Sequence, residues 1–415
     1  MLLVNKCTPG VHKRVTEENM RKLNKTAACG ILAAALAAGT LSGCSKAIDG
    51  TKTVATVGDE KVTLGLASYM VRDQQAQTMS YYNMLMSQYG VSGSASNVWD
   101  QKGDDGKTVG ESSKDGVMTT INQLYVLKAH AADYDVTITD DEEKAIKEAA
   151  AEFIKDNDEK ILKKLAVSED DIVTYLELVT IRSKMHDPMT ADVDTEVSAN
   201  EKDQTRVTIV KVSTEGTEKD DDGNTIDLTD EEKAQKKDLA QQVLDKVKAS
   251  DDVANADMDA LAKEVDDSLS ATAPAFTTAG STDDTLDEAV QDAALELKDG
   301  EVADSVIEGD DGYYVVRLDK MLDEDATENK EKTVISERKS DLFDSTLEDW
   351  VKEEKIKVKD KVWDQITVTD SVSFVYKSAD SSDDTKSSDV QDSTEDTSSQ
   401  DNSEDTTTED TAAED

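Results

Sequence analysis

Apolar residues recur at helical spacing through the first part of the chain. An alternating segment, Val54 to Thr63, comes first and is broken by Gly58-Asp59, so it predicts a short β-hairpin. The spacing then predicts helices over residues 64–89 and 117–134. A third helix is predicted to begin at its cap, Thr139, and a fourth begins at its cap, Ser168, and ends before Pro188. Residues 91–116 are rich in Gly, Ser and Asp and predict a loop. This region is therefore expected to be helical.

The hydrophobic period changes from helical to strand-like at Arg206. Residues 206–212 are β-branched and predict a strand, and residues 313–318 predict a second one after Gly312. Between them the pattern predicts a helix capped by Thr229 and two further helices over residues 258–265 and 286–297. Strand, helix, helix, helix, strand over about 120 residues favours one compact α+β domain, with its first and last strands in the same sheet.

A third apolar stretch follows this domain. Residues 332–352 predict a helix that carries Trp350, and residues 356–358 and 362–368 predict extended segments. The apolar face of this stretch has no partner nearby in sequence, so we expect it to pack back on the N-terminal helices. The predicted fold class is α+β: a helical domain built from the N- and C-terminal segments together, with an α+β domain inserted between them.

The N-terminus carries the features of a secretory signal peptide. Arg21, Lys22 and Lys25 precede an apolar, Ala/Gly-rich run from Ala27, which closes on Leu41-Ser42-Gly43-Cys44. The run lies at the lower limit for a spanning helix, which disfavours a permanent anchor. The closing residues resemble the lipobox of bacterial lipoproteins. That resemblance implies cleavage after residue 43, a diacylglyceryl thioether on Cys44 and tethering to the cell membrane outside the cytoplasm. Residues 1–19 are expected to be an upstream extension.

Composition excludes several classes of chemistry. Cys7, Cys29 and Cys44 all lie in or before the predicted signal peptide, so the mature chain is expected to hold no disulfide, zinc–thiolate site or cysteine nucleophile. The only histidines are His12, His130 and His186, which argues against a histidine-rich metal site or a conventional triad. We expect neither a metal nor a cofactor.

The charge is strongly acidic. The chain carries a net charge of −46, and residues 378–415 alone hold fourteen Asp/Glu against one Lys386. An acidic balance of this size repels nucleic acid, so no nucleic-acid partner is expected. The tail has too few apolar residues to fold, and we predict that it is disordered.

Four segments together resemble the parvulin-type extracytoplasmic foldases of the PrsA and SurA group. They are residues 205–211, 258–263, 293–302 (Ala-Ala-Leu-Glu-Leu-Lys-Asp-Gly-Glu-Val) and 312–318 (Gly-Tyr-Tyr-Val-Val-Arg-Leu). The resemblance implies the following domains: a lipoprotein signal peptide, 1–43; a helical chaperone region, 44–200; a parvulin-like domain, 201–325; a C-terminal segment packed on the N-terminal region, 326–377; and the acidic tail, 378–415.

The resemblance also implies a site. The family uses two histidines, and their positions here are occupied by Thr208 and Tyr314, so the isomerase site is expected to be degenerate. Each hydroxyl can donate and accept, so the two could share a hydrogen bond, and the alternative is that both are ordinary strand residues. The counterparts of the family's substrate groove are Phe276, Leu286 and Val290.

Three functions remain open from the sequence. The first is a membrane-tethered chaperone that holds unfolded or newly secreted polypeptides, since Met and Tyr side chains suited to promiscuous contact concentrate in the 64–89 helix. The second is an active peptidyl-prolyl isomerase, so whether the protein is an enzyme stays open. The third, a solute-binding or adhesive lipoprotein, is disfavoured because only one short α+β segment is predicted. The oligomeric state is left open between a monomer and a dimer.

Overall fold

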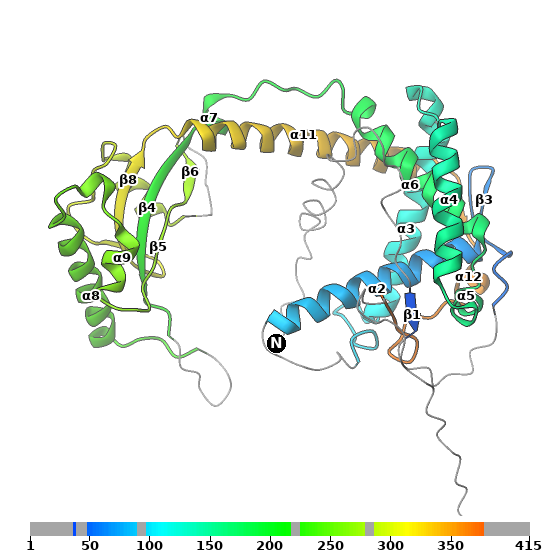
Figure 1. The fold of residues 1–415 in the computed structure, drawn as a ribbon, viewed down its shortest axis with the longest axis horizontal. Helices are drawn as coiled ribbons and strands as arrows, with labels where there is room; N and C mark the ends of the chain where they lie inside the picture. Colours follow the sequence, from blue (N-terminus) through cyan, green and yellow to red (C-terminus); the bar gives the residue numbers. More distant parts are fainter. Residues whose placement is uncertain (1–35, 39–47, 89–96, 217–224, 279–285, 377–415) are drawn as a thin grey trace, which may run out of the picture.

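Two lobes joined by one long helix make up the described part of the chain (Figure 1). A computed structural model describes residues 36–38, 48–88, 97–216, 225–278 and 286–376. Cys44 and residues 378–415, on which the lipidation and tail predictions rest, lie outside these ranges. No helix in the described ranges is long and apolar enough to cross a membrane.

The first lobe, called here the helical lobe, is built from both ends of the chain. Its N-terminal elements are β1 Leu36–Ala38, β2 Thr53–Val57, β3 Glu60–Thr63, α2 Leu64–Gln88, α3 Val109–His130, η1 Ala131–Tyr134, α4 Asp140–Asp156, α5 Glu159–Leu165 and α6 Glu169–Met189. Its C-terminal elements are the end of α11 Glu324–Glu353, β9 Ile356–Val358, α12 Asp360–Trp363 and β10 Phe374–Tyr376. Strands β3, β2 and β9 form one small sheet in that order, and β1 pairs with β10 in another.

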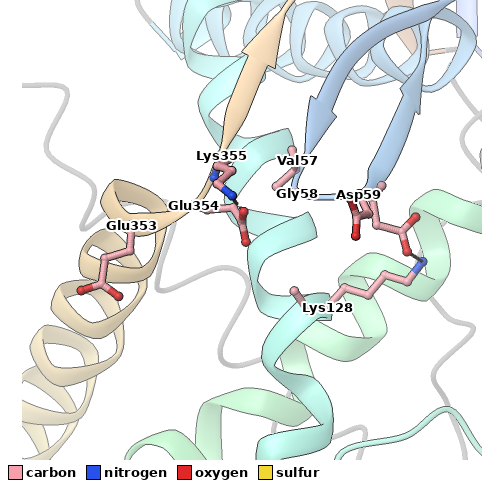
Figure 2. A pocket seen from close by; sticks show the side chains of 9 residues that line it. Val57, Gly58, Asp59, Lys128, Glu353, Glu354 and Lys355 are labelled. Carbon is pink, nitrogen blue, oxygen red and sulfur yellow. Dashed lines mark hydrogen bonds and ion pairs between the residues drawn. The ribbon is translucent and has the colours of Figure 1, made fainter.

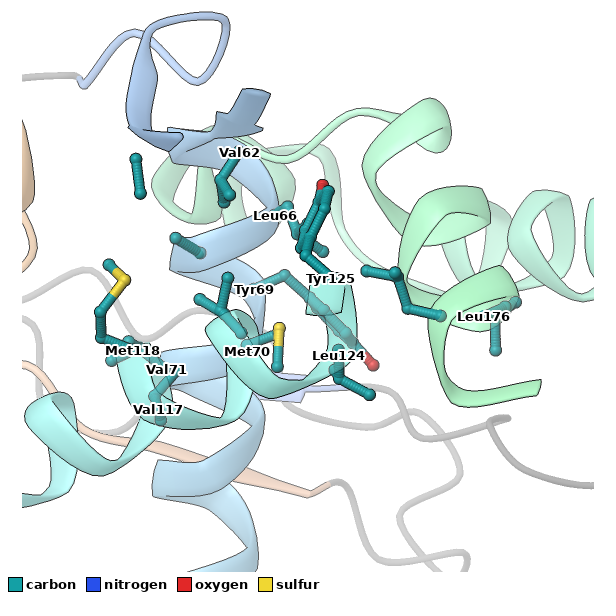
Figure 3. Close-up of a cluster of buried hydrophobic side chains, with 14 of the residues drawn as sticks. Val62, Leu66, Tyr69, Met70, Val71, Val117, Met118, Leu124, Tyr125 and Leu176 are labelled. Carbon is teal, nitrogen blue, oxygen red and sulfur yellow. The ribbon is translucent and has the colours of Figure 1, made fainter. Parts of the chain in front are cut away.

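One hydrophobic core unites these two sets of elements. Tyr69 on α2 and Leu124 on α3 lie in it, and Figure 3 shows them among the neighbouring side chains. The C-terminal segment contributes the following buried residues to the same core: Phe343, Leu347, Trp363, Ile366, Val368 and Phe374. The predicted return of the C-terminal segment to the N-terminal helices is therefore confirmed.

The second lobe, called here the sheet lobe, is inserted between these two halves. Its elements are β4 Gln204–Ser213, α8 Asp230–Lys248, η2 Val253–Asn255, α9 Met258–Lys263, β5 Ala271–Thr272, β6 Ala275–Thr277, α10 Glu288–Leu295, β7 Ile307–Gly309 and β8 Gly312–Lys320. The strand order is β5-β4-β8-β7, with β6 also paired to β4. Val207 on β4 lies opposite Leu318 on β8, so the first and last predicted strands share a sheet as expected. The predicted α+β fold class is confirmed.

The two chain segments that join the lobes are tied to each other. Helix α11 runs for 30 residues, or about 45 Å, and the segment that leads into β4 through α7 Ala199–Lys202 lies along it (Figure 1). Arg338 of α11 donates to the carbonyl oxygens of Asp194 and Glu196, at 3.0 and 2.8 Å, and forms an ion pair with Glu201. These contacts fix the direction in which the sheet lobe leaves the helical lobe.

Local signals explain most element boundaries. Thr139 and Ser168 cap α4 and α6 through complete capping boxes, as predicted. The 91–116 loop prediction was wrong in part, because Thr108 and Glu111 form another capping box that begins α3 at Val109. Helix α6 continues through Pro188 to Met189, since the proline stands in the last turn and removes only one N–H there.

Residues 362–363, predicted as extended, belong instead to the short helix α12. The amides of Val362 and Trp363 both donate to the carbonyl of Lys359, at 2.8 and 3.0 Å. A short apolar run fits a helical turn as well as a strand, so periodicity does not separate the two states. The helical turn brings Trp363 into the core.

Asp73 gives the helical lobe a testable pH dependence. Its carboxylate is buried on α2 and accepts from the hydroxyl of Tyr376, at 2.8 Å, and from the amide of Gln77, at 2.7 Å. Burial raises the pKa of Asp73 above 3.8, so the folded state binds this proton more tightly than the unfolded state does. The contribution of Asp73 to stability therefore falls as pH rises from 3.8 through that raised value.

Asp73→Asn should remove this dependence. The neutral amide can keep both hydrogen bonds once Gln77 turns its carboxamide over, and it removes a buried charge. We expect a gain of about 1 kcal/mol in unfolding free energy at pH 7 and a smaller gain at pH 4, measured by urea denaturation. Exposed Asp104→Asn serves as the control. Equal gains at the two pH values would contradict the assignment.

Candidate functional site

The sheet of the second lobe has two faces that differ in what covers them. On β4, Val207 and Ile209 pack towards α10, whereas Val210 and Val212 pack towards α8 and α9. This alternation follows from the two-residue period of a strand. We call the α10 side the groove face, because the predicted groove residues lie on it.

The three predicted groove residues come together on the groove face. Phe276 on β6 and Val290 on α10 are fully buried in one cluster that also contains Tyr314. Leu286, just before α10, is half-buried and packs against the same cluster. The structure thus brings these three side chains together, with Phe276 and Val290 buried inside the cluster and Leu286 half-buried at its edge, and their role in binding substrate stays a prediction.

Tyr314 is held by charged neighbours. Its hydroxyl donates to Oδ1 of Asp311, and Nζ of Lys211 lies 2.5 Å from Oδ2 of the same carboxylate. Burial and this carboxylate both raise the pKa of Tyr314, while Lys211 and Tyr314 lower the pKa of Asp311. The phenol therefore stays protonated and acts as a fixed hydrogen-bond donor.

Thr208 lies on the opposite face of the sheet. Its hydroxyl donates to Oδ2 of Asp319 at 2.6 Å and accepts from Nη2 of Arg317 at 3.3 Å. Arg317 also donates to the carbonyl oxygens of Val253 and Ala256, at 3.2 and 2.8 Å. Of the two alternatives, a hydrogen bond between Thr208 and Tyr314 is therefore not formed, and Thr208 contacts the arginine that links η2 to the sheet.

The residue that faces Tyr314 across the sheet is Lys211. The register pairs Lys211 with Tyr314 and Thr208 with Arg317. Directly opposed residues in an antiparallel pair have Cβ atoms about 4.5–5.5 Å apart, so Lys211 and Tyr314 are immediate neighbours. Sequence reasoning missed Lys211 and Asp311, because the register of β4 against β8 depends on contacts more than 100 residues apart.

The helical lobe offers a second candidate surface at the end of α2. Tyr81 and Met84 are 54% and 61% exposed. By contrast Tyr69, Met70 and Met79, which belong to the same predicted set of soft side chains, are buried in the core. In Figure 1 the end of α2 projects away from its lobe on the side of the sheet lobe. Of these five side chains only Tyr81 and Met84 are accessible to another chain.

The two histidines in the described ranges are far from the groove face. The ring of His130 stacks on Trp350 of α11 with 4.1 Å between centroids, and His186 lies 5.5 Å from Phe343 of the same helix. Both therefore pack against α11 in the helical lobe. Within the described ranges no group of three or more His, Cys, Asp or Glu side chains could hold a metal ion.

A surface hollow lies at the base of the hairpin. Figure 2 shows it between the β2–β3 turn, α3 and the junction of α11 with β9, where Gly58 donates to the carbonyl of Lys355 at 3.0 Å. Its lining is mostly charged: Asp59, Glu60, Lys128, Glu353, Glu354 and Lys355. Mixed charges of this kind are a poor match for apolar segments of an unfolded polypeptide.

Comparisons with known proteins identify one region of the chain. Residues 218–331 match the family described as the PPIC-type PPIase domain, a range that covers α8 to β8 and begins after β4. No curated protein matches the chain.

The chain is similar to crystal structures described as peptidylprolyl isomerase (PrsA). For the protein from Bacillus cereus the identity is 19%, the match covers 65% of this chain and 96% of that one, and the TM-score is 0.28. For the protein from Bacillus anthracis the corresponding values are 15%, 56%, 96% and 0.26. For PrsA from Bacillus subtilis they are 17%, 64%, 96% and 0.21.

Proposed function

We propose, from the premise that residues 218–331 of this chain are a PPIC-type, or parvulin, isomerase domain, that the protein is a membrane-tethered extracytoplasmic foldase. Its main activity is to hold unfolded or newly secreted polypeptides, and its isomerase site is degenerate. The degeneracy of the isomerase site is supported by the identity of the residues on the groove face. Tyr314, Asp311 and Lys211 form a fixed ionic cluster there, and residues 201–325 contain no histidine.

A fixed ionic cluster is unsuited to prolyl isomerisation. The barrier, about 18–20 kcal/mol, arises from amide resonance, and lowering it requires a dry pocket that favours the twisted amide. Lys211 and Asp311 are each roughly two-fifths exposed, so they keep this part of the face hydrated. The alternative is an isomerase that acts without the imidazole pair, and of the three predicted groove residues only Leu286 is accessible to a substrate for it.

The exposed end of α2 supports the holding activity. The flexible Met side chain adapts to many apolar shapes and Tyr offers an apolar ring with a polar tip. Tyr81 and Met84 are exposed at the end of α2, which projects on the side of the sheet lobe (Figure 1). A client held there would lie near the sheet lobe.

Refolding assays separate the two activities. We expect the protein to suppress aggregation of a denatured client at near-equal ratio, and to leave the slow, proline-limited phase of a second client unchanged at micromolar concentration. Isomerisation without catalysis takes tens of seconds or more, so an effect would be easily measured. An accelerated slow phase would establish the active isomerase, and an absence of suppression over several clients would refute the chaperone.

The register suggests a gain-of-function control for this assay. Lys211→His with Tyr314→His places two imidazoles opposite each other on the groove face. We expect this double variant to accelerate the slow phase. Thr208→His with Tyr314→His puts the imidazoles on opposite faces of the sheet and should have no effect.

Membrane tethering depends on Cys44. Cys44→Ser should abolish incorporation of a radiolabelled fatty acid and move the protein from the membrane fraction to the soluble fraction. Cys29→Ser, a cysteine upstream in the predicted signal peptide, is the matched control and should leave both unchanged. Labelled Cys44→Ser protein would contradict the lipobox.

A further inference from the structure

Strand β1 is part of the helical lobe, yet under the proposed function it is cleaved off with the signal peptide and is absent from the mature protein. Residues 36–38 pair with β10 in antiparallel register, Leu36 opposite Tyr376 and residue 38 opposite Phe374. The side chain of Leu36 is 1% exposed and lies in the main core. Yet these residues belong to the predicted signal peptide, which cleavage before Cys44 removes.

A buried polar group also depends on this strand. The amide of Leu36 donates to Oδ1 of Asn157 at 2.9 Å, and the side-chain nitrogen of Asn157 donates to the carbonyl of Phe153 at 2.8 Å. Asn157 is only 6% exposed. When β1 leaves, the buried amide oxygen of Asn157 loses the hydrogen bond from the Leu36 amide, so the vacated place favours a new backbone N–H.

Strand β10 is held in place independently of β1. The carbonyl of Val372, just before it, accepts from Gln75 at 2.6 Å, the guanidinium of Arg72 lies 5.1 Å from the centre of the Phe374 ring, and Tyr376 donates to Asp73. All three partners are on α2. Within the described ranges β1 is the only strand paired with β10, so its removal exposes a prearranged edge strand beside an apolar pocket.

From these contacts we infer that the edge of β10, the pocket of Leu36 and Asn157 form a binding site for extended apolar segments of client polypeptides. Residues 36–38 fill this site in the precursor, and removal of the signal peptide opens it. Recognition runs through the backbone, with one large aliphatic side chain in the pocket, as in other cases of strand addition to a sheet edge. The inference rests on the proposed function, because a client replaces the leader only if the leader is cleaved.

The full-length chain allows a direct test. The probe is a fluorescent peptide with the sequence of residues 31–40 between solubilising lysines. In the full-length chain the tethered leader competes at high effective concentration, so binding should be weak. Leu36→Asp should expel the leader, because a carboxylate cannot be buried in that pocket, and should strengthen peptide binding on the order of tenfold or more. Residues 374–376 should lose amide protection in this variant and regain it with the peptide.

Two controls decide what occupies the site. A peptide methylated on the nitrogen that corresponds to Leu36 cannot donate to Asn157 and should bind about tenfold more weakly. The processed chain, purified from the membrane, should behave as the Leu36→Asp variant does. Peptide binding that is unchanged in the Leu36→Asp variant would overturn the inference. A dimer of this variant or of the processed chain in which residues 374–376 stay protected would also overturn it, because a second copy of the chain would then occupy the site.

The aggregation assay separates this inference from the proposed function. If Leu36→Asp suppresses aggregation but does not bind the peptide, the foldase stands and the β10 site is refuted. If it binds the peptide but suppresses nothing, the site stands and the holding activity is refuted.

Discussion

Gly110→Ala is expected to destabilise the helical lobe by about 2–3 kcal/mol, one of the largest effects of a single methyl group in this protein. A Cβ atom at this position would lie 2.1 Å from the carbonyl oxygen of Val368 and 3.2 Å from that of Trp99. Both neighbours are backbone atoms that cannot rotate away. Helix α3 would have to move from the C-terminal segment, which also weakens the bond from the Gly110 amide to the Trp99 carbonyl, now 3.0 Å.

Gly116→Ala on the same helix provides the control. A Cβ atom there meets nothing within 4 Å, and the position is exposed. Replacing a glycine inside a helix by alanine should raise the unfolding free energy by about 0.5–1 kcal/mol. Urea denaturation followed by circular dichroism measures both changes. If the two variants shift stability equally, the close approach of α3 to Val368 does not contribute as described.

Tyr81→Asp with Met84→Asp is expected to weaken client binding by about tenfold. Each substitution replaces an exposed apolar side chain on the end of α2 by a charge, and covering a large apolar side chain stabilises a complex by about 1.5–3 kcal/mol when burial is complete. Partial burial in a promiscuous contact gives a smaller gain for each residue. The measurement is the ratio of protein to client needed for half-maximal suppression of aggregation.

The matched control adds the same charge without removing apolar surface. Asn83→Asp with Ser87→Asp alters two exposed polar positions on the same helical turns. This variant should suppress aggregation as the unaltered protein does. Equal loss in both double variants would mean that the added charge, and not the missing apolar surface, repels the client.

Elements defined by local signals were predictable from the sequence. The capping boxes at Thr139, Ser168 and Thr229 each begin a helix where expected, because the cap contacts only residues three positions away. The hairpin also formed as predicted, and Gly58 takes a φ of 56° at the first position of its turn. The Thr108 box could have been found by the same rule.

The site was less predictable, because it depends on register. The resemblance placed Thr208 and Tyr314 together, yet a difference of one residue in a strand moves a side chain to the other face of the sheet. The pairing of β4 with β8 is set by packing on α8, α9 and α10, and these contacts cannot be deduced from the strands themselves. Phe276 and Val290 converged because β6 and α10 lie on the same face, and Leu286 joins them because it immediately precedes α10.

The order of the elements has a consequence for the export proposed above. Strand β2 pairs with β3 on one side and with β9, 300 residues later, on the other, with Thr56 opposite Lys357. A chain that crosses a membrane from its N-terminus therefore delivers β2 long before its second neighbour. The sheet lobe can fold from its own contacts while it emerges. The β2–β3 hairpin, by contrast, keeps the other edge of β2 unpaired until β9, near the end of the chain, has been translocated. For the exported protein proposed above, completion of the helical lobe would thus be the last step of folding, and slow secretion would prolong the time in which β2 lacks its second neighbour and is open to unwanted pairing.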